Sequence, residues 1–409
     1  MSKNLERIWT KDFISIFITQ FLLFVAFYAL LTTLPIYVID SLNGSHSDGG
    51  LVVTVMLISA ILMRPFSAKL LEIVGKKKGL VLGVVTFTLT SFLYPFVNQF
   101  IPLLIVRFIH GLSFGIVTTA TGAIAADVVP ASRRGAGLGY FAMAMNTALV
   151  IGPFLGLSLL QITSFQNLFI VLNLLLLVGV ISSLSVKVPT YLEVNKKTIS
   201  FKLELSDLIE VNALPIALIS GLVGMAYGSI LSFISVYANS IGLATVASYF
   251  FLIFAVVMIS SRPYLGRAFD NRGPKFVLAP SLFIFALGLL FLSFSANAAM
   301  FLMAAGLVGL GYGSLLPGFQ TMAVQSTSPE RSGHATATFF IFYDLGIGTG
   351  SFVWGIVASI LGFSKMYMVS SALVIITLLI FNQYLSWKKK AKSVKKQKLK
   401  MKVQESKYS

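Results

Sequence analysis

Twelve long apolar runs dominate this sequence of 409 residues. Each has roughly the 20 residues with which an α-helix crosses the hydrocarbon core of a bilayer. The runs lack the alternation that marks the strands of a membrane β-barrel. Only 11% of the residues are charged, against about 25% in soluble domains. We therefore predict an all-α membrane protein with twelve transmembrane helices. The predicted spans are residues 13–38, 50–71, 79–96, 101–126, 137–161, 167–187, 213–238, 245–266, 276–294, 298–325, 335–361 and 367–386.

Basic residues predict how these spans are oriented. If the N-terminus is inside, 29 of the 31 lysines and arginines fall in inner segments, and only Arg107 and Lys365 do not. Because inner loops are enriched in positive charge, both termini are expected to be cytoplasmic. The first run is too long for a signal-peptide core and lacks a cleavage site, so we expect it to remain as the first span. Short loops favour a bacterial cell membrane.

The formal net charge of +17 needs no nucleic acid to explain it. The lysine-rich tail at residues 387–409 could bind RNA, but a lysine run beside a last span is more typical of a topology signal that contacts anionic lipids. With no cysteine, and histidines only at 46, 110 and 334, we expect neither a metal nor a cofactor. The sequence contains no phosphate-binding loop for ATP, no catalytic triad, and no loop long enough for a receptor domain. Ion-coupled transport of small molecules is the function that remains, and we expect the transporter to be a monomer.

The chain contains an internal repeat with a constant offset of 198 residues. The stretch "RPFSAKLLEIVGKKKGLVL" from residue 64 aligns with "RPYLGRAFDNRGPKFVLA" from residue 262. Further pairs at the same offset are Gly111 with Gly309, Gly115 with Gly313, Arg133 with Arg331, and Gly152 with Gly350. We predict two pseudo-symmetric six-helix bundles at residues 1–187 and 213–386, separated by a central cytoplasmic loop at 188–212. Such duplicated halves place a binding site between them, near the bilayer midplane.

The motifs resemble those of the major facilitator superfamily, and of its drug:proton antiporters in particular. The loops "AKLLEIVGKKK" and "GRAFDNRGPK" resemble the family's motif A, "RFIHGLSFG" its motif B, and "IGPFLG" its span-five motif C. The sequence departs from the motifs at several positions. Ala68 and Glu72 replace a glycine and an aspartate of motif A, His110 replaces the motif B glutamine, and Leu157 replaces the last motif C glycine.

The motif A loops are candidates for a gating latch. The acid in such a loop can pair with a helix N-terminus, while the lysines can bridge to Asp127 at the inner end of span four. The resemblance implies that the helix is span eleven, near Gly333 and His334, and that the latch holds the outward-open state. The alternative is that the lysines serve only as topology charges. The candidate latch residues are Glu72, Gly75, Lys76, Lys77 and Asp127, with Asp270, Gly273 and Lys275 in the second half.

Glycines four residues apart are expected to pack helices closely. Gly152 and Gly156 share a face of span five, and Pro153 between them removes a backbone donor. We therefore predict tight packing and a bend in this span.

Asp344 is the one acid expected deep inside a span. A carboxylate near the bilayer centre costs about 2.5–3.5 kcal/mol on insertion scales, so it should face the interior. Its repeat partner is the neutral Asn146, so a hydrogen bond alone does not require a charge at this position. We predict that Asp344 couples transport to protons. A static interhelical hydrogen bond and recognition of a cationic substrate are the alternatives.

Arg107 and His110 in span four are the other candidates for proton coupling. The resemblance associates the motif B arginine with this role. By depth, Arg107 is not level with Asp344, so we do not expect these two residues to form a salt bridge. His110 lies three residues further on, and it is either a second titrating site or a hydrogen-bonding group at a helix interface.

The resemblance implies that spans one, four, seven and ten line a central cavity. The candidate cavity residues are Gln20, Tyr28, Asn146, Tyr227, Tyr312 and Gln320. An aromatic cavity with few charges suits amphipathic drug-like or metabolite molecules. We expect proton-coupled efflux of such molecules, and the alternative is a proton symporter that imports a small neutral nutrient.

Overall fold

The computed structural model describes residues 7–130, 133–188, 209–327 and 331–408. Its helices α1 to α6 are Lys11–Ile36, His46–Val74, Lys76–Ser91, Phe100–Val128, Arg134–Ile162 and Phe165–Ser185. Helices α8 to α13 are Leu214–Ser240, Ala247–Arg272, Pro274–Ser293, Ala298–Val324, Ser332–Leu361 and Phe363–Tyr408. Three short helical segments lie at the helix ends: η1 at Tyr37–Ser41, η2 at Tyr94–Phe96 and η5 at Ala244–Val246. Twelve of these helices are long and apolar enough to cross a membrane. The predicted fold class is confirmed.

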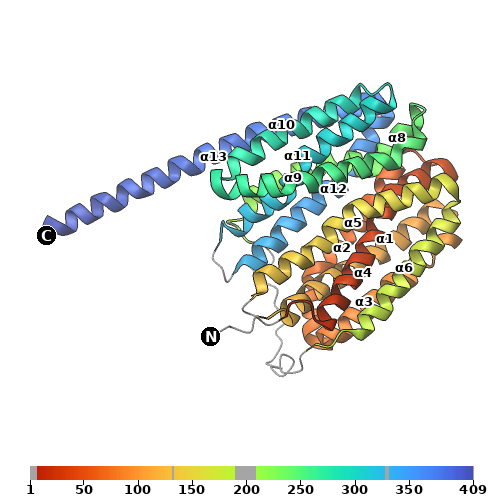
Figure 1. Cartoon of the computed structure of the whole chain (residues 1–409), viewed down its shortest axis with the longest axis horizontal. Coiled ribbons are helices and arrows are strands. Elements are labelled where there is room, and N and C mark those ends of the chain that lie inside the picture. The colour runs from red at the N-terminus through yellow and green to blue at the C-terminus, as the bar shows by residue number, and fades with distance from the viewer. Residues whose placement is uncertain (1–6, 131–132, 189–208, 328–330, 409) are drawn as a thin grey trace.

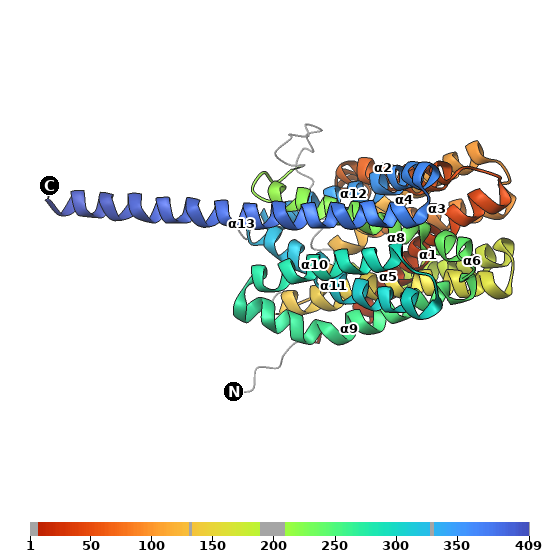
Figure 2. The same cartoon turned by 90° about the horizontal axis from the view of Figure 1, so that it is seen from above.

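The helices form two bundles, one of α1 to α6 and one of α8 to α13 (Figure 1). Both chain termini lie at the same end of the molecule, which we call the terminal end. The opposite end, called the far end, carries the turns at residues 42–45, 163–164, 241–246 and 362. Viewed from above, α13 continues well beyond the bundles (Figure 2). The central loop at 189–208 and the end of the tail lie outside the described residues, so the predicted domain limits stay predictions.

The 198-residue repeat reappears in the helix contacts. A Cβ atom on Gly111 of α4 would meet the carbonyl oxygen of Met56 in α2. One repeat later, a Cβ atom on Gly309 of α11 would meet the carbonyl oxygen of Phe254 in α9, which is the counterpart of Met56. Gly115 packs likewise against Ala60, and Gly313 against Met258. Since each side chain would displace a neighbouring helix, these glycines set the close approach of equivalent helix pairs in the two halves.

The two motif A loops share the same backbone geometry. Gly75 ends α2 with φ of 87°, and Gly273 ends α9 with φ of 84°. Only glycine adopts such positive φ angles without steric cost. Each glycine therefore allows the chain to turn directly into the next helix.

The halves meet through α1 with α8, α2 with α12, and α5 with α9. Near the far end, Gly50 of α2 lies against the backbone of Ser351 in α12, and Gly355 lies against that of His46. Gln161, near the end of α5, donates hydrogen bonds to the carbonyl oxygens of Ala244 and Thr245 at 3.3 and 3.2 Å. These contacts close the far end between the halves.

Lys77 fastens the first motif A loop to the end of α6. Its ammonium group donates to the carbonyl oxygens of Ser183, Leu184 and Val186 at 2.6, 2.7 and 2.6 Å. The last carbonyls of a helix have no intrahelical partner and carry its negative dipole end, so a cation there is stabilising. Lys77 is expected from the sequence to bridge to Asp127, but Lys76 makes that contact and Lys77 caps α6 instead.

We predict that Lys77→Met lowers the free energy of unfolding by about 1 kcal/mol, as expected for a cation at a helix C-terminus. The neighbouring Lys78 is exposed, so Lys78→Met is the matched control and should change little. Thermal unfolding in detergent measures both. Equal midpoints for the two variants would contradict the capping role.

Candidate functional site

Asp344 forms an ion pair with Arg64 across the boundary between the halves. The guanidinium of Arg64, in α2, lies 2.5 Å from the carboxylate of Asp344, in α12. Their side chains are 19% and 15% exposed. The expectation that Arg64 is an inner topology charge is wrong, because Arg64 lies within the membrane span at His46–Ser67. Asp344 therefore has a cationic partner inside the membrane, and that partner comes from the other half of the protein.

Three tyrosines lie near this pair, and a fourth stacks on one of them. Tyr227 stacks on Tyr312 with 4.0 Å between ring centroids, and the Tyr312 hydroxyl is hydrogen-bonded to that of Tyr343. The hydroxyls of Tyr28, Tyr312 and Tyr343 lie within electrostatic range of Asp344. The Tyr227 hydroxyl is buried and makes no hydrogen bond to a described residue. Two predicted cavity residues, Tyr28 and Tyr312, therefore lie near the ion pair, and the third, Tyr227, stacks on Tyr312. Tyr343 lies near the pair as well, and the sequence patterns did not indicate it.

The other predicted cavity residues are placed differently. Gln20 is buried in α1, and its side-chain oxygen accepts a hydrogen bond from Thr121 of α4 at 2.6 Å. It thus contributes to packing inside the first bundle. Asn146 and Gln320 are half-buried in α5 and α11. Their roles in a cavity stay predictions.

Arg107 and His110 form a separate cluster within the first bundle. Both are fully buried. Arg107 donates to the Val52 carbonyl oxygen at 3.0 Å and to the Tyr94 hydroxyl at 3.3 Å. That hydroxyl lies 2.8 Å from Nδ1 of His110, and the Phe87 ring covers the imidazole. These are contacts between helices, and none of them reaches Asp344. Proton coupling by either residue stays a prediction.

At the terminal end, Lys76 lies 2.5 Å from the Asp127 carboxylate. This contact ties the α2–α3 loop to α4, inside the first bundle. The side chain of Glu72 lies outside the described part, so its pairing with the α12 N-terminus stays a prediction. Asp270 and Lys275 line cavities beside α9 and α10. The latch itself therefore stays a hypothesis.

Gly152 and Gly156 hold α5 against α1. A Cβ atom on Gly152 would lie 2.8 Å from the Val25 carbonyl oxygen, and one on Gly156 would lie 3.0 Å from a methyl carbon of Thr33. Pro153 lies within α5, between these two contacts. The bend predicted there stays a prediction.

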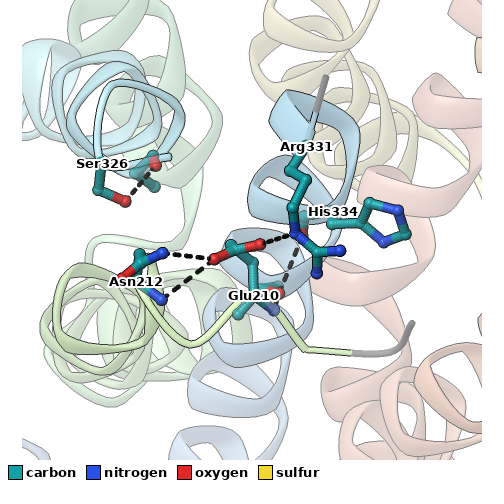
Figure 3. Close-up of polar contacts among 7 residues, drawn as sticks. Glu210, Asn212, Ser326, Arg331 and His334 are labelled. Atoms are coloured by element: carbon teal, nitrogen blue, oxygen red, sulfur yellow. Dashed lines mark hydrogen bonds and ion pairs between the residues drawn. The ribbon is translucent and has the colours of Figure 1, made fainter. Parts of the chain in front are cut away.

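A second ion pair fixes the chain where it enters the second half. Arg331 donates from Nε to the Glu210 carboxylate, which also accepts from the Asn212 side chain at 3.0 Å (Figure 3). The backbone N–H of Glu210 donates to Thr338 of α12 at 2.8 Å. These bonds attach the end of the central loop to the first turns of α12. From the sequence, Glu210 and Arg331 are expected to lie in loops, and no pattern near either residue indicates that they pair.

Comparison with known proteins agrees with this architecture. The model of the Major Facilitator Superfamily matches residues 16–349 and, in a second alignment, residues 216–404. The chain therefore belongs to the Major Facilitator Superfamily, and it is a transporter rather than an enzyme.

Individual relatives are distant but span nearly the whole chain. The multidrug resistance protein MdtG of Citrobacter koseri is 24% identical over 390 residues, covering 93% of this chain and 95% of that protein. MdtG of Escherichia fergusonii is 25% identical over 391 residues, covering 93% and 94%. The crystal structure of the nucleoside transporter NupG, as its D323A mutant, superimposes with a TM-score of 0.73 at 15% identity, covering 91% of this chain and 99% of that one. At that identity, the superposition shows a shared fold only.

We predict that Arg64 and Asp344 are energetically coupled. Arg64→Gln and Asp344→Asn should each lower the thermal midpoint in detergent, because each leaves a charge in the membrane without its partner. The double variant should be more stable than the sum of the two losses implies, with a coupling of about 0.5–3 kcal/mol. Strictly additive losses would show that the two side chains do not interact in the folded protein.

The Glu210 pair should make stability depend on pH. The hydrogen bond from Arg331 holds the pKa of the Glu210 carboxyl below its ordinary value of 4.5. A lowered pKa stabilises the folded state above pH 4.5, and this stabilisation is lost as the pH falls through the native value. Wild-type protein should therefore unfold at a higher temperature than Glu210→Gln at pH 7, and the difference should vanish in the window below pH 4.5.

Thermal unfolding at stepwise lower pH measures this difference. In Arg331→Gln, the carboxyl loses the main group that lowers its pKa, so the loss of stability below pH 4.5 should be smaller than in wild type. A difference between wild type and Glu210→Gln that is the same at all pH values would rule out the pair as its origin.

Proposed function

We propose that this transporter exports small amphipathic molecules in exchange for protons, with Asp344 as the proton-carrying group. The observation behind the proposal is the Arg64–Asp344 pair, which joins the two halves inside the membrane. Transport in this fold requires the halves to move against each other around a central site. A bond between the halves that depends on the charge of Asp344 links that motion to proton binding.

Charge balance gives the proposed sequence of events. While Asp344 is ionised, its attraction to Arg64 holds α12 against α2. Protonation removes the negative charge and weakens the pair, so the halves can separate at this point and rearrange. Loss of the proton on the other side of the membrane restores the attraction. The repeat supports this assignment, because the counterpart of Asp344 is Asn146 and only one of the two symmetric interfaces holds this charge pair.

The cell-membrane location and the orientation belong to the same proposal. The excess of lysine and arginine at the terminal end supports a cytoplasmic position for both termini. The contacts between the halves that close the far end would then lie on the outer side of the membrane. The export direction is supported by the similarity to proteins named for multidrug resistance.

Transport in inverted membrane vesicles with an imposed pH gradient tests this function. Asp344→Asn keeps the shape of the side chain but cannot carry a proton, so gradient-driven accumulation of a fluorescent cytotoxic dye should fall to the equilibrium level. Exchange of dye at equal concentrations on both sides should persist. Asp40→Asn is the matched control, because Asp40 is an exposed acid at the far end.

Unchanged accumulation by Asp344→Asn would remove this residue from the mechanism. The alternative is a proton symporter that imports a neutral nutrient. Such a symporter would accumulate its substrate in inverted vesicles only when the pH gradient has the opposite sign.

A further inference from the structure

Arg262 is the counterpart of Arg64 in the second half, and its surroundings differ. Arg64 pairs with Asp344 of α12, whereas one repeat away the position of Asp344 is occupied by Asn146 of α5, the helix that packs against α9. The structure records no ion pair for Arg262 with any described residue. Its Nε atom is buried and without a hydrogen-bond partner in the described chain. A guanidinium inside a membrane span has a high free energy without a counter-charge. Binding of an anion would therefore stabilise Arg262.

A cavity adjoins Arg262. It has a volume of about 270 Å³ and lies between α9 and α11. Residues lining it on α11 run from Gly313 to Thr321, and on α9 from Arg262 to Asp270. Since both helices advance in this direction toward the motif A loop and the end of α11, the cavity extends from Arg262 in the span toward the terminal end. A solute at that end can therefore approach the guanidinium.

Among the residues that line this cavity, none is an anion near Arg262. Asp270 lies eight residues beyond Arg262 on the same helix, which is about 12 Å along the axis, and its side chain is exposed at the cavity mouth. The two hydroxyl groups in the wall already donate elsewhere. Ser314 donates to Ser281 at 2.7 Å, and Thr321 donates to the Pro317 carbonyl oxygen at 2.8 Å. The remaining lining is mostly apolar: Leu265, Phe269, Val277 and Pro317.

We propose that Arg262 binds the oxyanion of an amphipathic substrate, with the apolar part of the substrate against the α9 and α11 walls. The planar guanidinium matches a carboxylate or a phosphate-like group with two parallel hydrogen bonds, which a lysine cannot reproduce. Pockets for drug-sized molecules begin at roughly 300 Å³, so this cavity suits a small aromatic or aliphatic acid. The inference rests on the proposed transport function and narrows its substrate class to anionic amphiphiles.

Binding to the purified protein in detergent tests the proposal with two probes of equal shape. 2-Naphthoate carries the anion, and 2-naphthamide is its neutral analogue. Wild-type protein should bind 2-naphthoate at least about ten-fold more tightly than 2-naphthamide. Arg262→Gln should lose about ten-fold or more in affinity for 2-naphthoate, because a desolvated charge pair is removed, and should keep its affinity for 2-naphthamide.

Two further variants separate recognition from general damage. Arg262→Lys keeps the charge without the planar fork and should retain part of the preference for the anion. Arg267→Gln lies on the same helix, where the guanidinium is exposed over the Tyr264 ring, and should bind both probes as wild type does. Arg262→Gln should also unfold at the same or a higher temperature than wild type, since it removes a cation without a partner.

The proposal is overturned if wild-type protein does not bind 2-naphthoate, if it does not prefer the anion, or if Arg262→Gln keeps the preference. This binding measurement is independent of the transport assay on Asp344→Asn. Loss of the anion preference with intact proton-driven dye export would refute only the role of Arg262. Intact anion binding without proton-driven export would refute only the coupling proposal.

Discussion

The cost of placing a charge in hydrocarbon organises the functional centre of this transporter. An ionised side chain in a membrane span must find a partner or water. Asp344 pairs with Arg64 on the opposite half, and the hydroxyls of Tyr28, Tyr312 and Tyr343 lie within electrostatic range of it. Because Arg64 belongs to the other half, the attraction between the two charges also holds the two bundles together at this point. Any change in the charge of Asp344 therefore acts on the relation between the halves and not only on α12.

The duplication gives the protein two copies of each interface, and the copies differ most in their charged residues. The close helix contacts at Gly111 and Gly309 are the same in both halves, as expected for features that serve packing alone. The charged positions differ. Lys76 binds Asp127 in the first half, whereas Pro274 and Gln325 occupy these positions one repeat later. Packing is thus kept symmetric while charge is not.

The fold could be predicted from the sequence because its signals are local and repeated. Runs of about 20 apolar residues predict spans, and a constant offset aligns Gly75 with Gly273, which share the same rare backbone angle. The partners of the charges could not be predicted in this way. Arg64 lies 280 residues from Asp344, and nothing near it in the sequence indicates which helix it faces. One signal was available, since the predicted second span already included residue 64.

The same limit applies to Lys77, Glu210 and Tyr343. Their contacts depend on how helix ends and loops meet after the bundles have packed, and hydrophobic periodicity carries no information on that step. Glu210 is an extreme case, because its partner Arg331 lies 121 residues further along the chain.

The two arginines together constrain where water can reach the centre. When Asp344 is neutral, Arg64 loses its counter-charge, and its cost in the membrane rises unless water or an anion replaces the carboxylate. Arg262 has this requirement in every protonation state of Asp344. Both groups therefore favour conformations in which a hydrated path reaches the centre from one side, and the cavity beside Arg262 extends toward the terminal end. In the proposed mechanism, a proton on Asp344 and an anion at Arg262 change the local charge in opposite senses, so we expect each to affect the occupancy of the other.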